Sequence, residues 1–140
     1  MALTRPRAAQ IYNLDYKQAV RAVAVSNVTL AGGAPAVVDG VTLAVNDRVL
    51  CTGQSTGSQN LIYVVTTVGS GSNGTWTTAY DDNTTGELDA GTIVMVTEGL
   101  VYADTQWKLI TDNPITIGTT SLTWTQNYRS EEHTSELQSH

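Results

Sequence analysis

The residues of this chain best suited to chemistry are carboxylates gathered in one polar stretch. Asp81 and Glu87 lie in the stretch 81–91, together with Asp82 and Asp89. Two carboxylates can act as the acid and the base of a glycosidase, and acidic loops can hold Ca²⁺ through oxygen ligands. The spacing fits no EF-hand loop, however, and acidic surface loops are common without any chemistry. We therefore predict a solvated loop, with no catalytic residue, no metal and no cofactor.

A nucleophile paired with a base is missing from the first 128 residues. Both histidines, His133 and His140, lie in the last segment of the chain, and Cys51 is its single cysteine. This removes the Ser–His–Asp and Cys–His arrangements and the usual zinc ligands. Cys51 ends an apolar stretch, where we expect a small buried side chain and not a reactive thiol. The glycine-rich segment 69–74 lacks the lysine and the helix of a phosphate-binding loop. The sequence predicts that this protein is not an enzyme.

Three tryptophans are the remaining candidates for a binding site. Trp76, Trp107 and Trp124 offer large apolar ring faces on which a sugar could stack. All three lie in predicted strands, where packing in the core is the usual role. Trp76 is the best candidate for exposure and is our candidate for glycan contact. An exposed tryptophan beside a polar loop would favour carbohydrate binding, whereas three buried tryptophans would favour a scaffold.

Charge and hydropathy exclude two kinds of partner. The chain has 140 residues and a formal net charge of −6, which makes it a poor binder of nucleic acid. It contains no apolar stretch long enough for a transmembrane helix, so we expect no membrane insertion. Arg5 and Arg7 are not followed by the apolar run of a signal peptide. We expect a protein that is assembled in the cytoplasm.

The elements that would position these residues are short strands. Valine and threonine dominate them, as is typical of half-buried pleated surfaces, and segments rich in Gly, Ser, Asn and Asp separate them. This pattern predicts an all-β fold, a small antiparallel β-sandwich or barrel, with no helix longer than two turns. The strands are expected near 19–25, 28–31, 36–38, 41–44, 47–52, 61–67, 74–79, 92–97, 105–111 and 121–127.

Local patterns add detail to this prediction. Asp39-Gly40 between apolar pairs predicts a tight hairpin turn, and Asn46-Asp47 predicts a second turn. The stretches 61–65 and 93–96 are apolar on both faces and should be central strands, whereas 105–111 and 121–127 alternate and should bury one face. The residues expected to be mostly buried are Val49, Ile62, Val64, Val94, Val96, Trp107, Leu109 and Trp124.

The chain divides into three segments. Residues 1–15 form an N-terminal arm that is basic at Arg5 and Arg7, and 16–128 form the β domain. Residues 129–140 resemble the translation of a common sequencing adapter, so we interpret them as an artefactual, disordered tail. On this interpretation, the natural protein continues beyond Tyr128.

The order of several motifs resembles a known module. "DGVTLAVNDRVL", a polar loop and "IYVV" look like a β-module of bacteriophage tail fibres and other virion tail proteins. The match runs from about Tyr16 to Gln126. Leu61 stands where the family usually has glycine, and Cys51-Thr52-Gly53 displaces a usual lysine, which affects the loops and not the module. The other residues that resemble this module are Lys17, Val20-Arg21, 27–30, 74–77, 94–99, 103–107, 117–120 and 122–124.

The resemblance implies a function without catalysis, because the family offers no catalytic residue to carry over. It implies a structural module of a phage tail fibre or related virion tail protein, forming the N-terminal part of a longer receptor-binding protein. Its partners would be other virion tail proteins and further copies of itself, and its location the virion tail. The alternative is a carbohydrate-binding module that contacts host cell-surface glycan.

Overall fold

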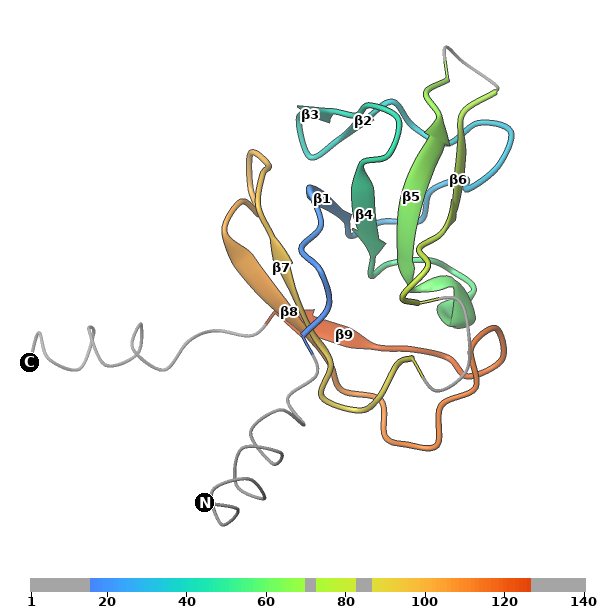
Figure 1. Cartoon of the computed structure of the whole chain (residues 1–140), viewed down its shortest axis with the longest axis vertical. Coiled ribbons are helices and arrows are strands. Elements are labelled where there is room, and N and C mark those ends of the chain that lie inside the picture. The colour runs from blue at the N-terminus through green and yellow to red at the C-terminus, as the bar shows by residue number, and fades with distance from the viewer. Residues whose placement is uncertain (1–15, 70–72, 83–86, 127–140) are drawn as a thin grey trace, which may run out of the picture.

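The computed structural model describes residues 16–69, 73–82 and 87–126 (Figure 1). The predictions for the arm 1–15, for the tail 129–140 and for the middle of the acidic loop lie outside these residues.

The described residues form an all-β fold, as the sequence predicts. They contain short strands and a single 3₁₀ turn, η1, so the expectation of no long helix is confirmed for this part of the chain. In chain order the elements are β1 (Ala22–Ala24), β2 (Val37–Val38), β3 (Val41–Thr42), β4 (Arg48–Cys51), η1 (Gly57–Gln59), β5 (Ile62–Thr67), β6 (Thr75–Thr78), β7 (Ile93–Val96), β8 (Thr105–Leu109) and β9 (Trp124–Gln126).

The strands make three open sheets. One has the order β1-β4-β5-β6, a second is the pair β2-β3, and the third has the order β7-β8-β9. The described strands therefore form no closed barrel. Neighbouring strands are antiparallel except β1 and β4, which pair in parallel with Ala22 opposite Val49. The predicted antiparallel pairing therefore holds for the other strand pairs, and β1 with β4 is the exception.

The segment 16–21 joins the two larger sheets. Lys17 N donates to Ile93 O at 3.0 Å, Val20 N donates to Met95 O at 2.9 Å, and Thr97 N donates back to Val20 O at 3.0 Å. The next residue turns to the other sheet, where Arg21 N donates to Arg48 O at 2.8 Å. In Figure 1 this segment runs between β7 and β4. β5 is central, as predicted. The prediction that 93–96 is a central strand is wrong, because β7 ends its own sheet; the segment 16–21 covers its outer edge.

The turn at Asp39-Gly40 is confirmed. Both residues have positive φ angles, 49° and 77°, as the mirror-image hairpin turns require. Val38 pairs with Val41 across the turn, and both valines are buried. Asn46 also has a positive φ, and Asp47 N donates to Ala44 O at 3.1 Å, which confirms the second turn.

The predicted strand at 28–31 is wrong. The amide of Gln54 takes the place of a neighbouring strand, because its Oε1 accepts from Val28 N at 2.8 Å and its Nε2 donates to Val28 O at 3.0 Å. Only an isolated bridge, Ala31 to Thr75, remains of strand pairing there. A side chain from a distant loop thus satisfies the backbone groups that would have formed a ladder.

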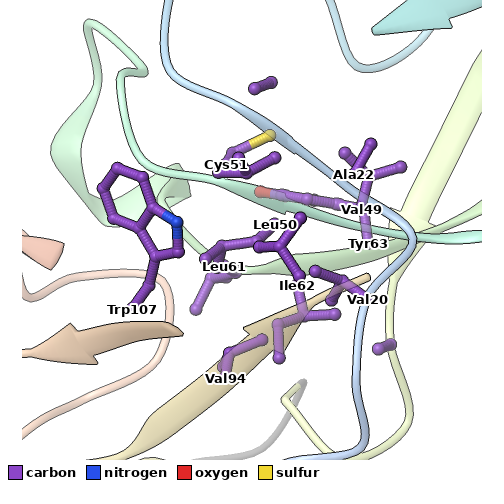
Figure 2. Packing of buried hydrophobic residues seen from close by; sticks show 14 of the residues in the cluster. Val20, Ala22, Val49, Leu50, Cys51, Leu61, Ile62, Tyr63, Val94 and Trp107 are labelled. Carbon is purple, nitrogen blue, oxygen red and sulfur yellow. The ribbon is translucent and has the colours of Figure 1, made fainter. Parts of the chain in front are cut away.

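The core lies between the two larger sheets and the hairpin. Figure 2 shows Val49, Leu50, Ile62 and Val94 among its residues. Seven of the eight residues predicted to be buried are so. Val64 is only half-buried, because its cross-strand partners on β4 and β6 are the polar residues Arg48 and Thr77.

Candidate functional site

Asp81, one of the two carboxylates considered for acid–base chemistry and set aside, is bound by an arginine. Arg48 Nη1 and Nη2 each donate to one carboxylate oxygen of Asp81, both at 3.1 Å, and Nη2 also donates to Gln18 O at 2.9 Å. Such a bidentate ion pair fixes the position and orientation of the carboxylate. At Glu87 the backbone carbonyl accepts a hydrogen bond from Lys17 Nζ. Among the described residues, no three side chains of Asp, Glu, His or Cys lie close enough together to hold a metal ion.

The prediction of a solvated loop is wrong at Asp82, which is buried. Its side chain is 0 % exposed, and its Oδ2 accepts a hydrogen bond from Ile62 N at 2.7 Å. Its Oδ1 accepts no hydrogen bond from the described residues. Burial raises the pKa of this carboxyl to about 7, although Ile62 N–H, Lys17 and Arg48 act in the opposite direction. Nothing in the sequence distinguishes Asp82 from Asp81 beside it.

The tryptophans do not provide a stacking surface. Trp76 is 3 % exposed, so the candidate glycan contact is corrected: its ring face is covered. Trp107 and Trp124 are buried as well, and Trp124 Nε1 donates to Asn60 O at 2.8 Å. Sequence reasoning overlooked Tyr80, an aromatic side chain that is 72 % exposed beside the acidic stretch.

A hollow at the end of β8 is a weak candidate for a ligand site. Its volume is about 360 Å³, and its lining includes Lys108, Ile110 and Asp112. None of its described lining residues is aromatic, and it is open to solvent. It lacks the enclosed apolar shape with a few converging polar groups that small-molecule sites usually have.

Cys51 is inert, as expected from its place in a strand. It is completely buried in β4, and burial raises the pKa of its thiol to about 12. The thiolate is the reactive form of cysteine, so this side chain cannot serve as a nucleophile near neutral pH.

The most distinctive surface feature is the loop 99–102 between β7 and β8, which we name the display loop. Asp39 holds its backbone: Leu100 N donates to Asp39 O at 2.9 Å, Val101 N to Oδ1 at 3.1 Å, and Tyr102 N to Oδ2 at 3.0 Å. The side chains of Leu100 and Val101 nevertheless point into solvent and are 84 % and 69 % exposed. The loop is therefore fixed in its backbone and apolar at its tip.

Both ends of the display loop are anchored. At the start, Leu100 lies over the hairpin turn, where a Cβ on Gly40 would come within 2.4 Å of Leu100 Cγ. At the end, Thr105 Oγ1 donates to Tyr102 O at 2.7 Å, and the Tyr102 ring meets Trp107 edge to face at 5.7 Å. The display loop thus packs on the hairpin turn that the sequence predicts.

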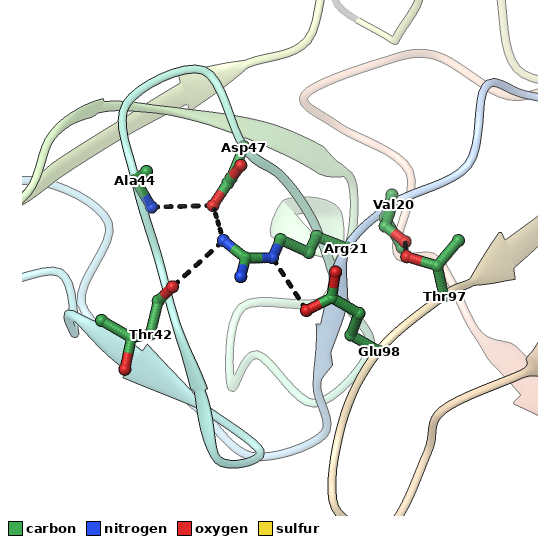
Figure 3. A network of polar contacts seen from close by, with 7 residues as sticks. All are labelled: Val20, Arg21, Thr42, Ala44, Asp47, Thr97 and Glu98. Atoms are coloured by element: carbon green, nitrogen blue, oxygen red, sulfur yellow. Dashed lines mark hydrogen bonds and ion pairs between the residues drawn. The ribbon is translucent and has the colours of Figure 1, made fainter.

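An arginine network fixes the chain just before the display loop (Figure 3). Arg21 Nε donates to Glu98 Oε1 at 3.0 Å, and Arg21 Nη1 donates to Asp47 Oδ2 at 2.6 Å and to Thr42 O at 3.1 Å. Asp47 Oδ2 also accepts from Ala44 N at 2.7 Å. The network ties β1, the hairpin and the end of β7 together.

Comparison with protein-family models, with curated proteins and with solved structures gives no match for this chain. Among the described residues, no helix has the length and hydropathy needed to cross a membrane.

Proposed function

We propose that this protein is a non-enzymatic structural module of a phage tail fibre or a related virion tail protein, acting through protein–protein association. Its partners are other virion tail proteins and further copies of itself, and it is assembled in the host cytoplasm. The motif order from Tyr16 to Gln126 supports the family, and the display loop supports the mode of action.

The observation that carries this proposal is the exposure of Leu100 and Val101 on a fixed backbone. An exposed apolar side chain on a mobile loop would lose conformational freedom on binding, which weakens association. Here three hydrogen bonds to Asp39 have already ordered the loop. A rigid apolar tip is suited to fill a pocket on a protein surface.

The burial of all three tryptophans also favours a scaffold over a sugar-binding module. Trp76, Trp107 and Trp124 stabilise the core instead of lining a surface. Of the acids in the stretch 81–91, Asp81 is bound by Arg48 and Asp82 lies inside the protein.

The test uses the double substitution Leu100→Ser with Val101→Ser in the full chain. We expect the wild-type chain to form complexes, with itself or with the products of neighbouring virion genes, when these are co-expressed. The double variant should lose at least about tenfold in affinity, the equivalent of 1.4 kcal/mol. Ile110→Ser is the matched control, because Ile110 is also an exposed apolar residue but lies outside the display loop. Equal binding by the double variant, or a gene neighbourhood without virion genes, would contradict the proposal.

Carbohydrate binding is the second candidate function, and the exposed ring of Tyr80 favours it. A sugar could stack on this ring beside the polar chain that follows β6. An array of bacterial surface glycans tests this candidate. Binding that is lost in Tyr80→Ala would support it, whereas the absence of binding by the wild-type chain would remove it.

A further inference from the structure

The turn 79–82, which follows β6, is attached to the beginning of β5 through a buried carboxyl group. Ala79 N donates to Ile62 O at 2.9 Å, and Ile62 N donates to Asp82 Oδ2 at 2.7 Å. The turn closes on itself through Asp82 N, which donates to Ala79 O at 3.0 Å. Asp82 therefore caps the first residue of β5 while its own side chain is shielded from water.

The surroundings of this carboxyl do not suit a full negative charge. Oδ1 accepts no hydrogen bond from the described residues. Four charged or titratable groups face it: Lys17 from the segment before β1, Arg48 from β4, Tyr63 from β5, and Asp81 from the same turn. The Arg48 guanidinium is directed at Asp81, and Lys17 Nζ donates to Glu87 O. An ionised Asp82 would leave a buried charge with a single hydrogen bond, which is costly.

We propose that Asp82 is a proton-operated latch: the neutral carboxyl holds the turn 79–82 against β5, and loss of its proton to water loosens the turn.

The direction of the pH dependence follows from burial. In the unfolded chain Asp82 has its ordinary pKa near 4, and burial in the folded chain raises the pKa to about 7. Folding then binds a proton between these two values. Stability from this group is fully present below about pH 4 and is lost as the pH rises to about 7. Within that range the unfolding constant should rise by up to about tenfold for each pH unit.

The first experiment is an NMR titration of the Asp82 side-chain carboxyl carbon in the full chain. We expect a midpoint well above the ordinary value and closer to neutrality. A midpoint near pH 4 would overturn the proposal by itself, even if no variant folds.

The second experiment compares denaturant unfolding of Asp82→Asn, Asp81→Asn and the wild type at pH 4, 5.5 and 7. Asparagine keeps an acceptor for Ile62 N–H and cannot ionise. The free energy of unfolding of Asp82→Asn should therefore not show the wild-type decrease between pH 4 and pH 7. Asp81→Asn also removes an acid from this turn but should keep this decrease. The amide of Ala79 should exchange faster at pH 7 in the wild type than in Asp82→Asn, after correction for intrinsic exchange. A decrease retained by Asp82→Asn, or equal exchange of Ala79, would overturn the latch.

Discussion

At the scale of single residues, burial decides which side chains hold the fold and which remain free to bind. Trp107 is 8 % exposed, its ring meets Tyr102 edge to face, and its Nε1 donates to Thr105 Oγ1 at 3.1 Å. Tyr80 has a comparable aromatic ring but lies in solvent. The two residues form a natural pair for testing how the aromatic side chains are divided between core and surface.

Trp107→Ala should lower the free energy of unfolding by roughly 3–5 kcal/mol, since it removes a large buried side chain and leaves a cavity. Tyr80→Ala should change it by no more than about 0.5 kcal/mol, as is usual at exposed positions. Urea unfolding followed by far-UV circular dichroism measures both. An unchanged urea midpoint for Trp107→Ala would place Trp107 on the surface and would support a carbohydrate-binding role for its ring.

The sequence predicts residue roles where a pattern supports them and fails where only tertiary position matters. Alternation in β8 correctly predicts that Trp107 and Leu109 are buried. Asp81 and Asp82 are identical neighbours, yet one pairs with Arg48 and the other lies inside the protein. Trp76 was the best candidate for exposure among three tryptophans expected in the core, yet it is buried, and its backbone N donates to Leu30 O at 2.7 Å.

At the scale of elements, local signals predict strands and turns but not long-range pairing. The Asp39-Gly40 turn follows from two residues that tolerate positive φ. The parallel pairing of β1 with β4 and the seating of the display loop on the hairpin join parts of the chain far apart in sequence. No local pattern encodes either contact, so sequence reasoning could not place the display loop.

Two glycine substitutions test the seat of the display loop. Gly91 and Gly99 both have positive φ angles, 89° and 139°. No described atom lies within 4 Å of a Cβ at Gly91, whereas a Cβ at Gly99 would lie 2.2 Å from Asp39 Oδ2. Gly91→Ala should lower the free energy of unfolding by about 1–2 kcal/mol through backbone strain alone. Gly99→Ala should cost at least about 1 kcal/mol more, because Asp39 must move and release hydrogen bonds to the loop.

Denaturant unfolding of the two glycine variants provides the comparison. The amides of Val101 and Tyr102 should also exchange faster in Gly99→Ala, since these amides donate to Asp39. Equal losses of stability with unchanged exchange would mean that Asp39 is not the anchor of the loop.

At the scale of the whole molecule, the segment 16–24 makes the two larger sheets interdependent. Its first part bonds to β7, and its second part pairs with β4. Val20 is buried in the middle of this segment and bridges Val96. Neither sheet can separate from the other without breaking this segment from one of them, so we expect the described domain to unfold as one cooperative unit.

Two probes on opposite sheets test this cooperativity. Cys51 lies in β4, is fully buried and has a pKa raised to about 12, so alkylation requires that its sheet open. The amide of Leu109 lies in β8 and donates to Thr92 O at 2.9 Å, so its exchange requires that the other sheet open. Iodoacetamide labelling and hydrogen exchange should give the same opening free energy. Val20→Ala should lower both values equally, whereas Val101→Ala, at an exposed position, should lower neither. If Cys51 reacts at a clearly lower free energy than Leu109 exchanges, the sheets open separately and segment 16–24 does not couple them.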